Sequence, residues 1–127
     1  MGIYCRIELL SVLNEKECFE FEALVDASAT WLTLPAVWRD KFMSLAPGRE
    51  AHFWRPENKI IVGEVCGPVE IRIEGFRRSF GEVMFVELQP KDGKLIPLVG
   101  SLQLELSQAL LDRANQKLVP MKSYPLK

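Results

Sequence analysis

One stretch of the sequence, residues 19–35, constrains the fold more than any other. It alternates apolar and acidic residues as far as Glu22, and it is almost wholly apolar from there to Val25. A single carboxylate, Asp26, then stands in a run of small residues, after which apolar residues resume and end at Pro35. This pattern predicts a half-exposed strand that enters the interior and ends at a tight turn. Because a buried carboxylate is costly unless it is paired or hydrogen-bonded, an acid at this place needs a specific explanation.

Length and composition limit the classes of protein to which the chain can belong. The 127 residues predict a single domain, residues 1–127, with one core. The hydrophobic fraction of 48% and the charged fraction of 26% are typical of a soluble globular protein. The formal net charge of -1 gives no electrostatic basis for binding nucleic acid or an anionic membrane. The sequence has no apolar run of membrane-spanning length and no visible signal peptide, so we expect a cytoplasmic protein.

The residues that most often bind metals or cofactors form no motif. Cys5, Cys18 and Cys66 are odd in number and widely spaced, which predicts reduced thiols instead of a disulfide framework or a zinc site. Cys18 and Cys66 are expected to be buried. The sequence has no glycine-rich nucleotide loop, and we expect neither a cofactor nor a metal. The single histidine, His52, has no accompanying Ser or Cys motif and is expected to be a surface or packing residue.

The rest of the chain consists of short apolar or alternating segments separated by turn signals. Strands are predicted over residues 3–13, 17–25, 31–34, 60–66, 69–74, 79–88 and 95–100, with a break at Gly67–Pro68. A helical turn is predicted over 36–42, a loop over 44–50, a short helix capped by Ser101 over 101–107, and a final hairpin over 109–120. Many short strands with little helix predict a mainly β chain that closes into a mainly antiparallel barrel.

The segment from Ala23 to Pro35 resembles the active-site segment of retropepsin-like aspartic proteases. In that family an apolar strand ends in Asp-Thr/Ser-Gly-Ala-Ser/Thr, and a second apolar run closes with Leu-Pro. Asp26 matches the catalytic aspartate, and the other matching positions are Ala29, Thr30, Leu34 and Pro35. A later apolar-apolar-Gly element at residues 98–100, followed by a short helix and a final strand, is similar to the second half of these domains. The resemblance covers nearly the whole chain and implies a closed acid-protease barrel with one or two short helices.

The resemblance also implies an aspartic endopeptidase that hydrolyses a peptide or protein substrate. Such an enzyme needs two carboxylates so close that they share one proton. One then takes a proton from water while the other polarises the scissile carbonyl. The chain contains a single copy of the motif, so the second carboxylate has to come from a second copy of the chain. We therefore expect a homodimer with Asp26 of each subunit at the two-fold axis.

The resemblance assigns roles to further residues around Asp26. The active-site turn is expected to consist of Ala27, Ser28, Ala29 and Thr30, supported by Leu98, Val99 and Gly100. The hairpin over residues 51–63 is expected to be the flap over the substrate, with Trp54, Arg55, Ile60 and Ile61 as its substrate-binding residues. For Trp54 and Arg55 the alternative is a stack of the guanidinium on the indole at the hairpin tip, without a role in binding.

Two departures from the family pattern leave the activity open. Ala27 stands where the family has a Thr or Ser that bonds across the dimer axis, and Ser28 stands where it has Gly. The Ser28 side chain either crowds the site or supplies a hydroxyl in place of the lost one. The alternative function is a catalytically inactive homologue that acts as a dimeric peptide-binding or assembly module. A third hypothesis is an unrelated small β-barrel interaction module, in which Asp26 is only a turn residue.

Overall fold

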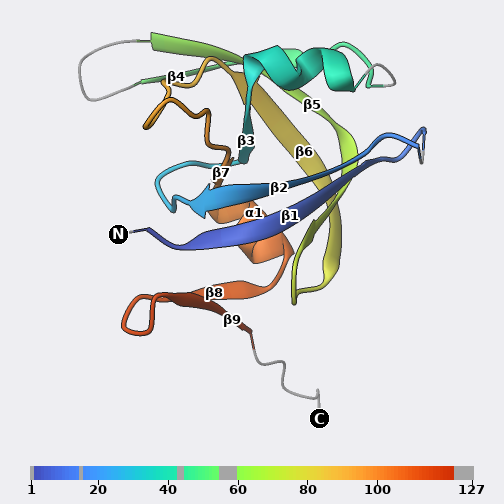
Figure 1. The fold of residues 1–127 in the computed structure, drawn as a ribbon. Coiled ribbons are helices and arrows are strands. Elements are labelled where there is room, and N and C mark those ends of the chain that lie inside the picture. The colour runs from blue at the N-terminus through green and yellow to red at the C-terminus, as the bar shows by residue number, and fades with distance from the viewer. Residues whose placement is uncertain (1, 15, 43–44, 55–59, 122–127) are drawn as a thin grey trace.

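The computed structural model describes residues 2–14, 16–42, 45–54 and 60–121, and within them the chain is mainly β (Figure 1). The strands are β1 (Tyr4–Ser11), β2 (Cys18–Val25), β3 (Leu32–Pro35), β4 (Arg49–Trp54), β5 (Ile60–Ile73), β6 (Arg78–Val86), β7 (Leu98–Val99), β8 (Ala109–Asp112) and β9 (Lys117–Pro120). Two short helices accompany them, the 3₁₀ helix η1 (Ala36–Lys41) and the α-helix α1 (Ser101–Leu106). The expectation of a mainly β chain with one or two short helices is confirmed.

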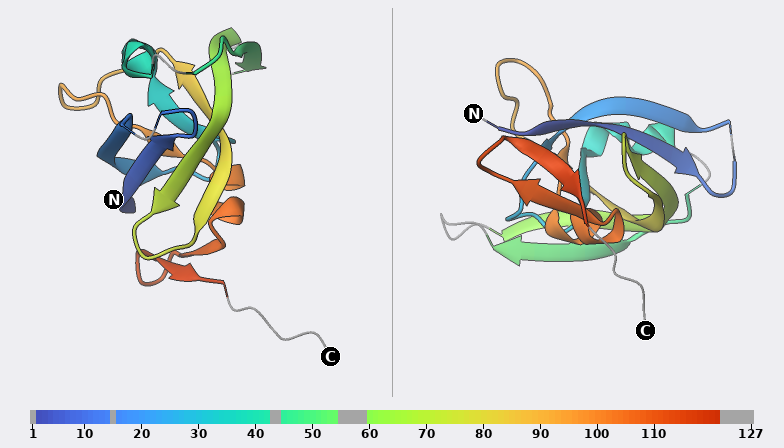
Figure 2. Two further views of the ribbon diagram at one scale, coloured as in Figure 1. Left: turned by 90° about the vertical axis from the view of Figure 1, so that its right-hand side faces the viewer. Right: turned by 90° about the horizontal axis from the view of Figure 1, so that it is seen from below.

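The main sheet returns to its first strand. Its order is β1-β2-β7-β3-β6-β5-β4, and β1 also pairs with β5, so backbone hydrogen bonds run in a ring through six of these strands. Seen from below, the β1–β2 hairpin lies on one side, and β4 with the start of β5 lies on the other (Figure 2). The pairs β2–β7 and β3–β6 are parallel, while the other pairs in the sheet are antiparallel. β8 and β9 form a separate two-stranded sheet at the bottom of Figure 1.

Period-two alternation fills the interior of the ring. In β1, Ile7 and Leu9 are fully buried, while Arg6 on the opposite face of the strand is exposed. The second half of β5 follows the same rule, with Ile71 and Ile73 buried. This alternation is what a strand with one buried face requires, and it confirms the predicted alternating strands in these two segments.

Aromatic rings fill the space between β2, η1 and β6. Phe42, directly after η1, lies with its ring centroid 4.5 Å from that of Phe19 and 5.9 Å from that of Phe85. Phe21 meets Trp38 edge-on at 5.3 Å, and the Lys41 ammonium lies 4.9 Å from the Trp38 ring. Aromatic and cation–π contacts of this kind contribute stability in addition to that gained by burying apolar area. They therefore hold η1 against the strands of the main sheet.

The predicted break at Gly67–Pro68 is wrong, because β5 continues through it. The register between β5 and β6 shifts between Cys66 and Val69, which is where the strand accommodates a proline that has no N–H to donate. Gly67 also lies close to β6, since a Cβ on it would lie 2.9 Å from the carbonyl oxygen of Gly81. The two residues that resemble a break are thus an irregularity within one long strand.

Other predicted boundaries and burials need correction. β7 spans only Leu98–Val99, so the strand predicted over 95–100 is too long, and β4 begins at Arg49, inside the predicted loop. Ser101 does not cap α1; Gly100 is the N-cap residue and makes no side-chain cap bond. Cys66 is buried as expected, but Cys18 is exposed, because it lies on the face of β2 that also carries the exposed Glu20 and Glu22.

An arginine in η1 ties the helix and the following loop to β5. The Nε atom of Arg39 donates to Oε1 of Glu64 at 3.1 Å, and its two Nη atoms donate to the carbonyls of Phe42 and Leu45 at 2.9 and 3.3 Å. The other carboxylate oxygen of Glu64 accepts a bond from the Gly48 N–H at 2.8 Å. That backbone bond, followed by Arg39, holds the pKa of Glu64 below its usual value although partial burial opposes this. The cluster fixes the base of the β4–β5 hairpin.

Acidification is expected to weaken this cluster. Because the folded-state pKa of Glu64 lies below its ordinary value of 4.5, its contribution to the free energy of unfolding is present above that pH and is lost as the pH falls through the folded pKa. Glu64→Gln should cost about 1 kcal/mol at neutral pH, an amount kept small by partial solvent exposure, and should flatten the acid part of the stability profile. Urea denaturation from about pH 7 to about pH 2 measures both effects.

The matched control is Glu87→Gln, because Glu87 is exposed just after β6 and has no partner among the residues described. That variant should keep the stability profile of the natural chain. An unchanged acid dependence in Glu64→Gln would contradict the assignment of the lowered pKa to this cluster.

Candidate active site

The backbone at Asp26 is held beside the end of β7. β2 runs parallel to β7 with Val25 opposite Val99, and Asp26 is the first residue after β2. The Asp26 N–H donates to the Val99 carbonyl at 3.0 Å, and the Asp26 carbonyl accepts from the Ala29 N–H, also at 3.0 Å. The first bond prolongs the parallel pairing by one residue, and the second closes a turn. Asp26 therefore sits, half-buried, at a position that both strands define.

The two oxygens of the Asp26 carboxylate differ in their surroundings. Oδ1 accepts two hydrogen bonds from Ser28, one from the backbone N–H at 3.0 Å and one from the hydroxyl at 2.5 Å. In the described part of the chain, no group donates a hydrogen bond to Oδ2. Hydrogen bonds to a carboxylate are shorter and stronger than those between neutral groups. Because Oδ1 accepts both bonds from Ser28, it is the oxygen that anchors the Asp26 side chain.

A glycine lets the neighbouring element approach the Asp26 turn closely. The Gly100 N–H donates to the Trp31 carbonyl at 3.1 Å, and the Leu102 N–H donates to the Thr30 carbonyl at 2.9 Å. A Cβ on Gly100 would lie 2.5 Å from both the carbonyl carbon and the oxygen of Thr30, which no side chain can do without moving the backbone. The structure thus brings together the predicted turn, residues 26–30, and the predicted supporting element, residues 98–100.

The outer edge of the turn is exposed. Ala27 and Ser28 both face solvent, and so does Thr30, whereas Ala29 is half-buried. Ala27 has no polar side chain, so the hydroxyl nearest to Asp26 along the chain is that of Ser28, which bonds to the carboxylate of its own chain. The Ser28 hydroxyl thus bonds within one chain, and the two alternatives for Ser28 at a dimer axis stay predictions.

The predicted flap is a β-hairpin, but its predicted contact residues do not share a face. β4 and β5 pair from Arg49–Val65 to Trp54–Ile60, and Ile60 is 55% exposed. Ile61 points to the other side, because successive residues of a strand alternate, and it packs against the buried cluster of Val65, Met84 and Val86. Arg55 and the rest of the predicted turn, 55–59, lie outside the described residues, as does the stacking predicted for Arg55 on Trp54.

Trp31 joins the Asp26 turn to the β4–β5 hairpin. It follows the Asp26 turn directly and packs against the same cluster as Ile61. The Asp26 turn and the hairpin are therefore connected by one shared apolar cluster. A large aromatic residue directly after a turn of small residues is the sequence signal for this link.

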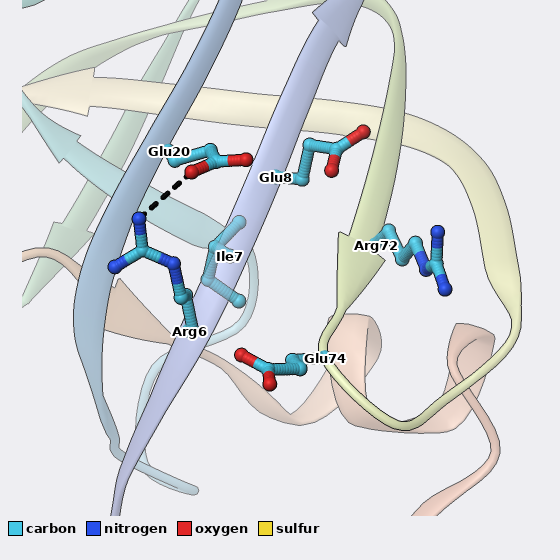
Figure 3. Close-up of a pocket in the computed structure, with 6 residues that line it drawn as sticks. All are labelled: Arg6, Ile7, Glu8, Glu20, Arg72 and Glu74. Carbon is cyan, nitrogen blue, oxygen red and sulfur yellow. Dashed lines mark hydrogen bonds and ion pairs between the residues drawn. The ribbon is translucent and has the colours of Figure 1, made fainter.

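A surface hollow of about 230 Å³ lies elsewhere, on the outer face of β1, β2 and β5 (Figure 3). Its lining residues are Arg6, Ile7, Glu8, Glu20, Arg72 and Glu74. Arg6 pairs with Glu20 at 2.8 Å across neighbouring strands, with both side chains more than half exposed. No residue of the Asp26 turn lines this hollow, and its charges are those of a solvated strand face.

Other candidate chemistry is missing from the described residues. Within the described ranges, no group of three His, Cys, Asp or Glu residues is arranged to hold a metal ion. His52 is exposed and lies 3.4 Å from the Glu50 carboxylate. None of the helices that the structure describes is long and apolar enough to cross a membrane.

Comparison with protein families and with curated proteins finds no relative of this chain. No protein-family model matches it, and no curated protein is significantly similar to it. The candidate site is therefore identified by the geometry around Asp26 and by the residues that form it.

Gly100→Ala is expected to disrupt the Asp26 turn. The added methyl group would collide with the Thr30 backbone, and overpacking of this kind typically costs about 1–3 kcal/mol of unfolding free energy. Chemical denaturation measures the loss, and NMR amide shifts of residues 26–31 report whether the turn moves.

Gly81→Ala is the matched control, because its added Cβ would meet only the end of the Leu106 side chain, at 3.2 Å. It should change stability little and leave the shifts of residues 26–31 in place. Equal effects of the two variants would contradict the close approach at Gly100.

Proposed function

We propose that this chain is a retropepsin-like aspartic endopeptidase, in which the Asp26 carboxylates of two identical subunits form the catalytic pair. The observation that supports this most is the half-buried Asp26 at the end of β2, whose Oδ1 accepts two bonds from Ser28 while Oδ2 accepts none from the described residues. The contact of its turn with Gly100 is the second support, because it joins the two segments that carry the resemblance. In this proposal the ring of strands is a closed acid-protease barrel.

The proposed chemistry uses one proton shared by two carboxylates. Two like charges at hydrogen-bonding distance cannot both ionise, so one Asp26 is a carboxylate and the other a carboxylic acid. The carboxylate takes a proton from a water molecule between them while the acid donates to the scissile carbonyl oxygen. The water oxygen bonds to the carbonyl carbon, and return of the proton to the amide nitrogen allows the C–N bond to break.

A second copy of the chain is essential to this proposal. In the part of the chain that the structure describes, no Asp or Glu side chain pairs with Asp26, so one subunit offers one acid. The exposed residues Ala27 and Ser28 form the surface where two turns would meet at a two-fold axis. The substrate is a peptide or protein segment that lies between the paired turns and the β4–β5 hairpins. We also propose a cytoplasmic location, where the three free thiols stay reduced.

Asp26→Asn should lower kcat/KM for an unfolded polypeptide by roughly 10²–10⁴-fold, because asparagine can neither accept nor donate the catalytic proton. The assay is hydrolysis of a denatured protein followed by mass spectrometry from acidic to neutral pH. Asp40→Asn is the matched control, since Asp40 is an exposed residue of η1, and it should keep full activity. Hydrolysis unaffected by Asp26→Asn would overturn the proposal.

Mixing subunits tests whether the pair is shared. If equal amounts of natural and Asp26→Asn chains exchange freely, random pairing leaves about a quarter of the dimers with two aspartates, and activity should fall to about that level. Activity that falls only to half would indicate that a single subunit is sufficient, and the dimeric proposal would then be wrong.

The specific observation that favours a second function is Ala27, which has no hydroxyl to offer across a dimer axis. Under this alternative the chain is an inactive homologue that binds peptides or only assembles as a dimer. Restoring the family residues in the double variant Ala27→Thr, Ser28→Gly should then create hydrolysis that the natural chain lacks. Activity in the natural chain, reduced in the double variant, would exclude the alternative. The measurement is the same polypeptide assay.

A further inference from the structure

Ser28 donates two hydrogen bonds to the Asp26 side chain. Its N–H and its hydroxyl both donate to Oδ1, at 3.0 and 2.5 Å, so one residue satisfies one carboxylate oxygen twice. The hydroxyl bond needs the Ser28 Cβ–Oγ group and a turn that brings position 28 back toward position 26. That turn is closed by the bond from the Ala29 N–H to the Asp26 carbonyl. Both the side chain and the local backbone are therefore arranged around Oδ1.

We propose that Ser28 is a positioning residue, whose hydroxyl fixes the Asp26 side chain in one rotamer about its Cα–Cβ bond, so that one carboxylate oxygen is bonded to Ser28 and the other is presented for the reaction. Rotation about the Cα–Cβ bond of Asp26 would carry the carboxylate away from Ser28 and break both bonds at once, whereas a half-turn about Cβ–Cγ would only exchange two equivalent oxygens. A glycine at position 28 would keep only the N–H, and an alanine would keep the N–H and the backbone geometry but not the hydroxyl. The hydroxyl thus makes the bond to Oδ1 that depends on the side chain at position 28. This inference rests on the proposed function.

The bond from the Ser28 hydroxyl to Asp26 orients the Asp26 carboxylate within a single subunit. Both partners belong to one chain, so each carboxylate is oriented within its own subunit before a second copy arrives. Ala27 fits this arrangement, because a methyl group contributes no orienting bond to either subunit. Assembly then only has to bring together two Asp26 side chains that already point correctly. Pre-organisation of this kind lowers the reorganisation needed when the catalytic pair forms.

Kinetics of Ser28→Ala and Ser28→Thr test the proposal. Loss of the hydroxyl should lower kcat roughly 10- to 100-fold, because one hydrogen bond to a charged group is lost and catalysis is sensitive to small misplacements. KM should stay within about twofold, since the substrate contacts are unchanged. Ser28→Thr keeps a hydroxyl and should restore most of kcat. Ser101→Ala, which removes an exposed serine hydroxyl that caps no helix end, should behave as the natural chain.

A second measurement makes the result independent of activity. Three-bond couplings to the Asp26 carboxyl carbon, measured by NMR on the natural chain, should report a single side-chain rotamer. The couplings should move toward averaged values in Ser28→Ala and return in Ser28→Thr. This readout requires neither substrate nor a dimer, and thermal unfolding of each variant verifies that it is folded.

The outcomes separate the inference from the function on which it rests. Asp26-dependent hydrolysis with a large loss of kcat in Ser28→Ala and recovery in Ser28→Thr supports both. Asp26-dependent hydrolysis that Ser28→Ala leaves unchanged overturns the inference and leaves the proposed function standing. Absence of Asp26-dependent hydrolysis overturns the function; the couplings then decide the inference, because equal rotamers in the natural chain and Ser28→Ala overturn it as well.

Discussion

The close approach of Gly100 to the backbone of Thr30 is the constraint on which the candidate site depends. Two segments separated by about 70 residues of sequence meet there with no side chain between them, which only glycine permits. The approach lets β2 pair in parallel with β7 and lets the Val99 carbonyl accept from the Asp26 N–H. Without β7 and Gly100, Asp26 would lie in a loop after the end of β2. Their contacts with residues 26–31 hold that loop in one defined conformation.

The site and the hairpin beside it are held by different kinds of interaction. Trp31 and Ile61 share one apolar cluster, which couples the turn to the hairpin through packing. The base of the hairpin is held by polar interactions instead, in the Arg39–Glu64 pair and in a second pair that joins Arg49 of β4 to Glu82 of β6. Ionised carboxylates are therefore part of the framework around the proposed catalytic pair. The pH of maximum activity and the pH of maximum stability need not coincide.

The sequence predicts the parts of this structure that depend on local pattern. Alternation places the faces of β1 and β5 correctly, because burial on one side of a strand leaves a period of two. The pairing of β1 with β5 has no local signature, and neither does the close approach at Gly100; the resemblance implied only that residues 98–100 support the Asp26 turn. The Gly67–Pro68 prediction failed because turn residues within a long strand resemble a strand end. The direction of the Ser28 hydroxyl also cannot be predicted from the sequence, because the Ser28 rotamer depends on where the Asp26 carboxylate lies.

The proposed enzyme exists only if two copies of this chain bring their Asp26 side chains together. A crystal structure of the purified protein, with the separation of the nearest Asp26 carboxylates in neighbouring subunits as the quantity of interest, tests it most directly. We expect a two-fold dimer in which carboxylate oxygens of the two subunits lie about 3 Å apart and hold one water between them. A monomer, or a dimer in which the two Asp26 carboxylates lie far beyond hydrogen-bonding reach of each other, would contradict it.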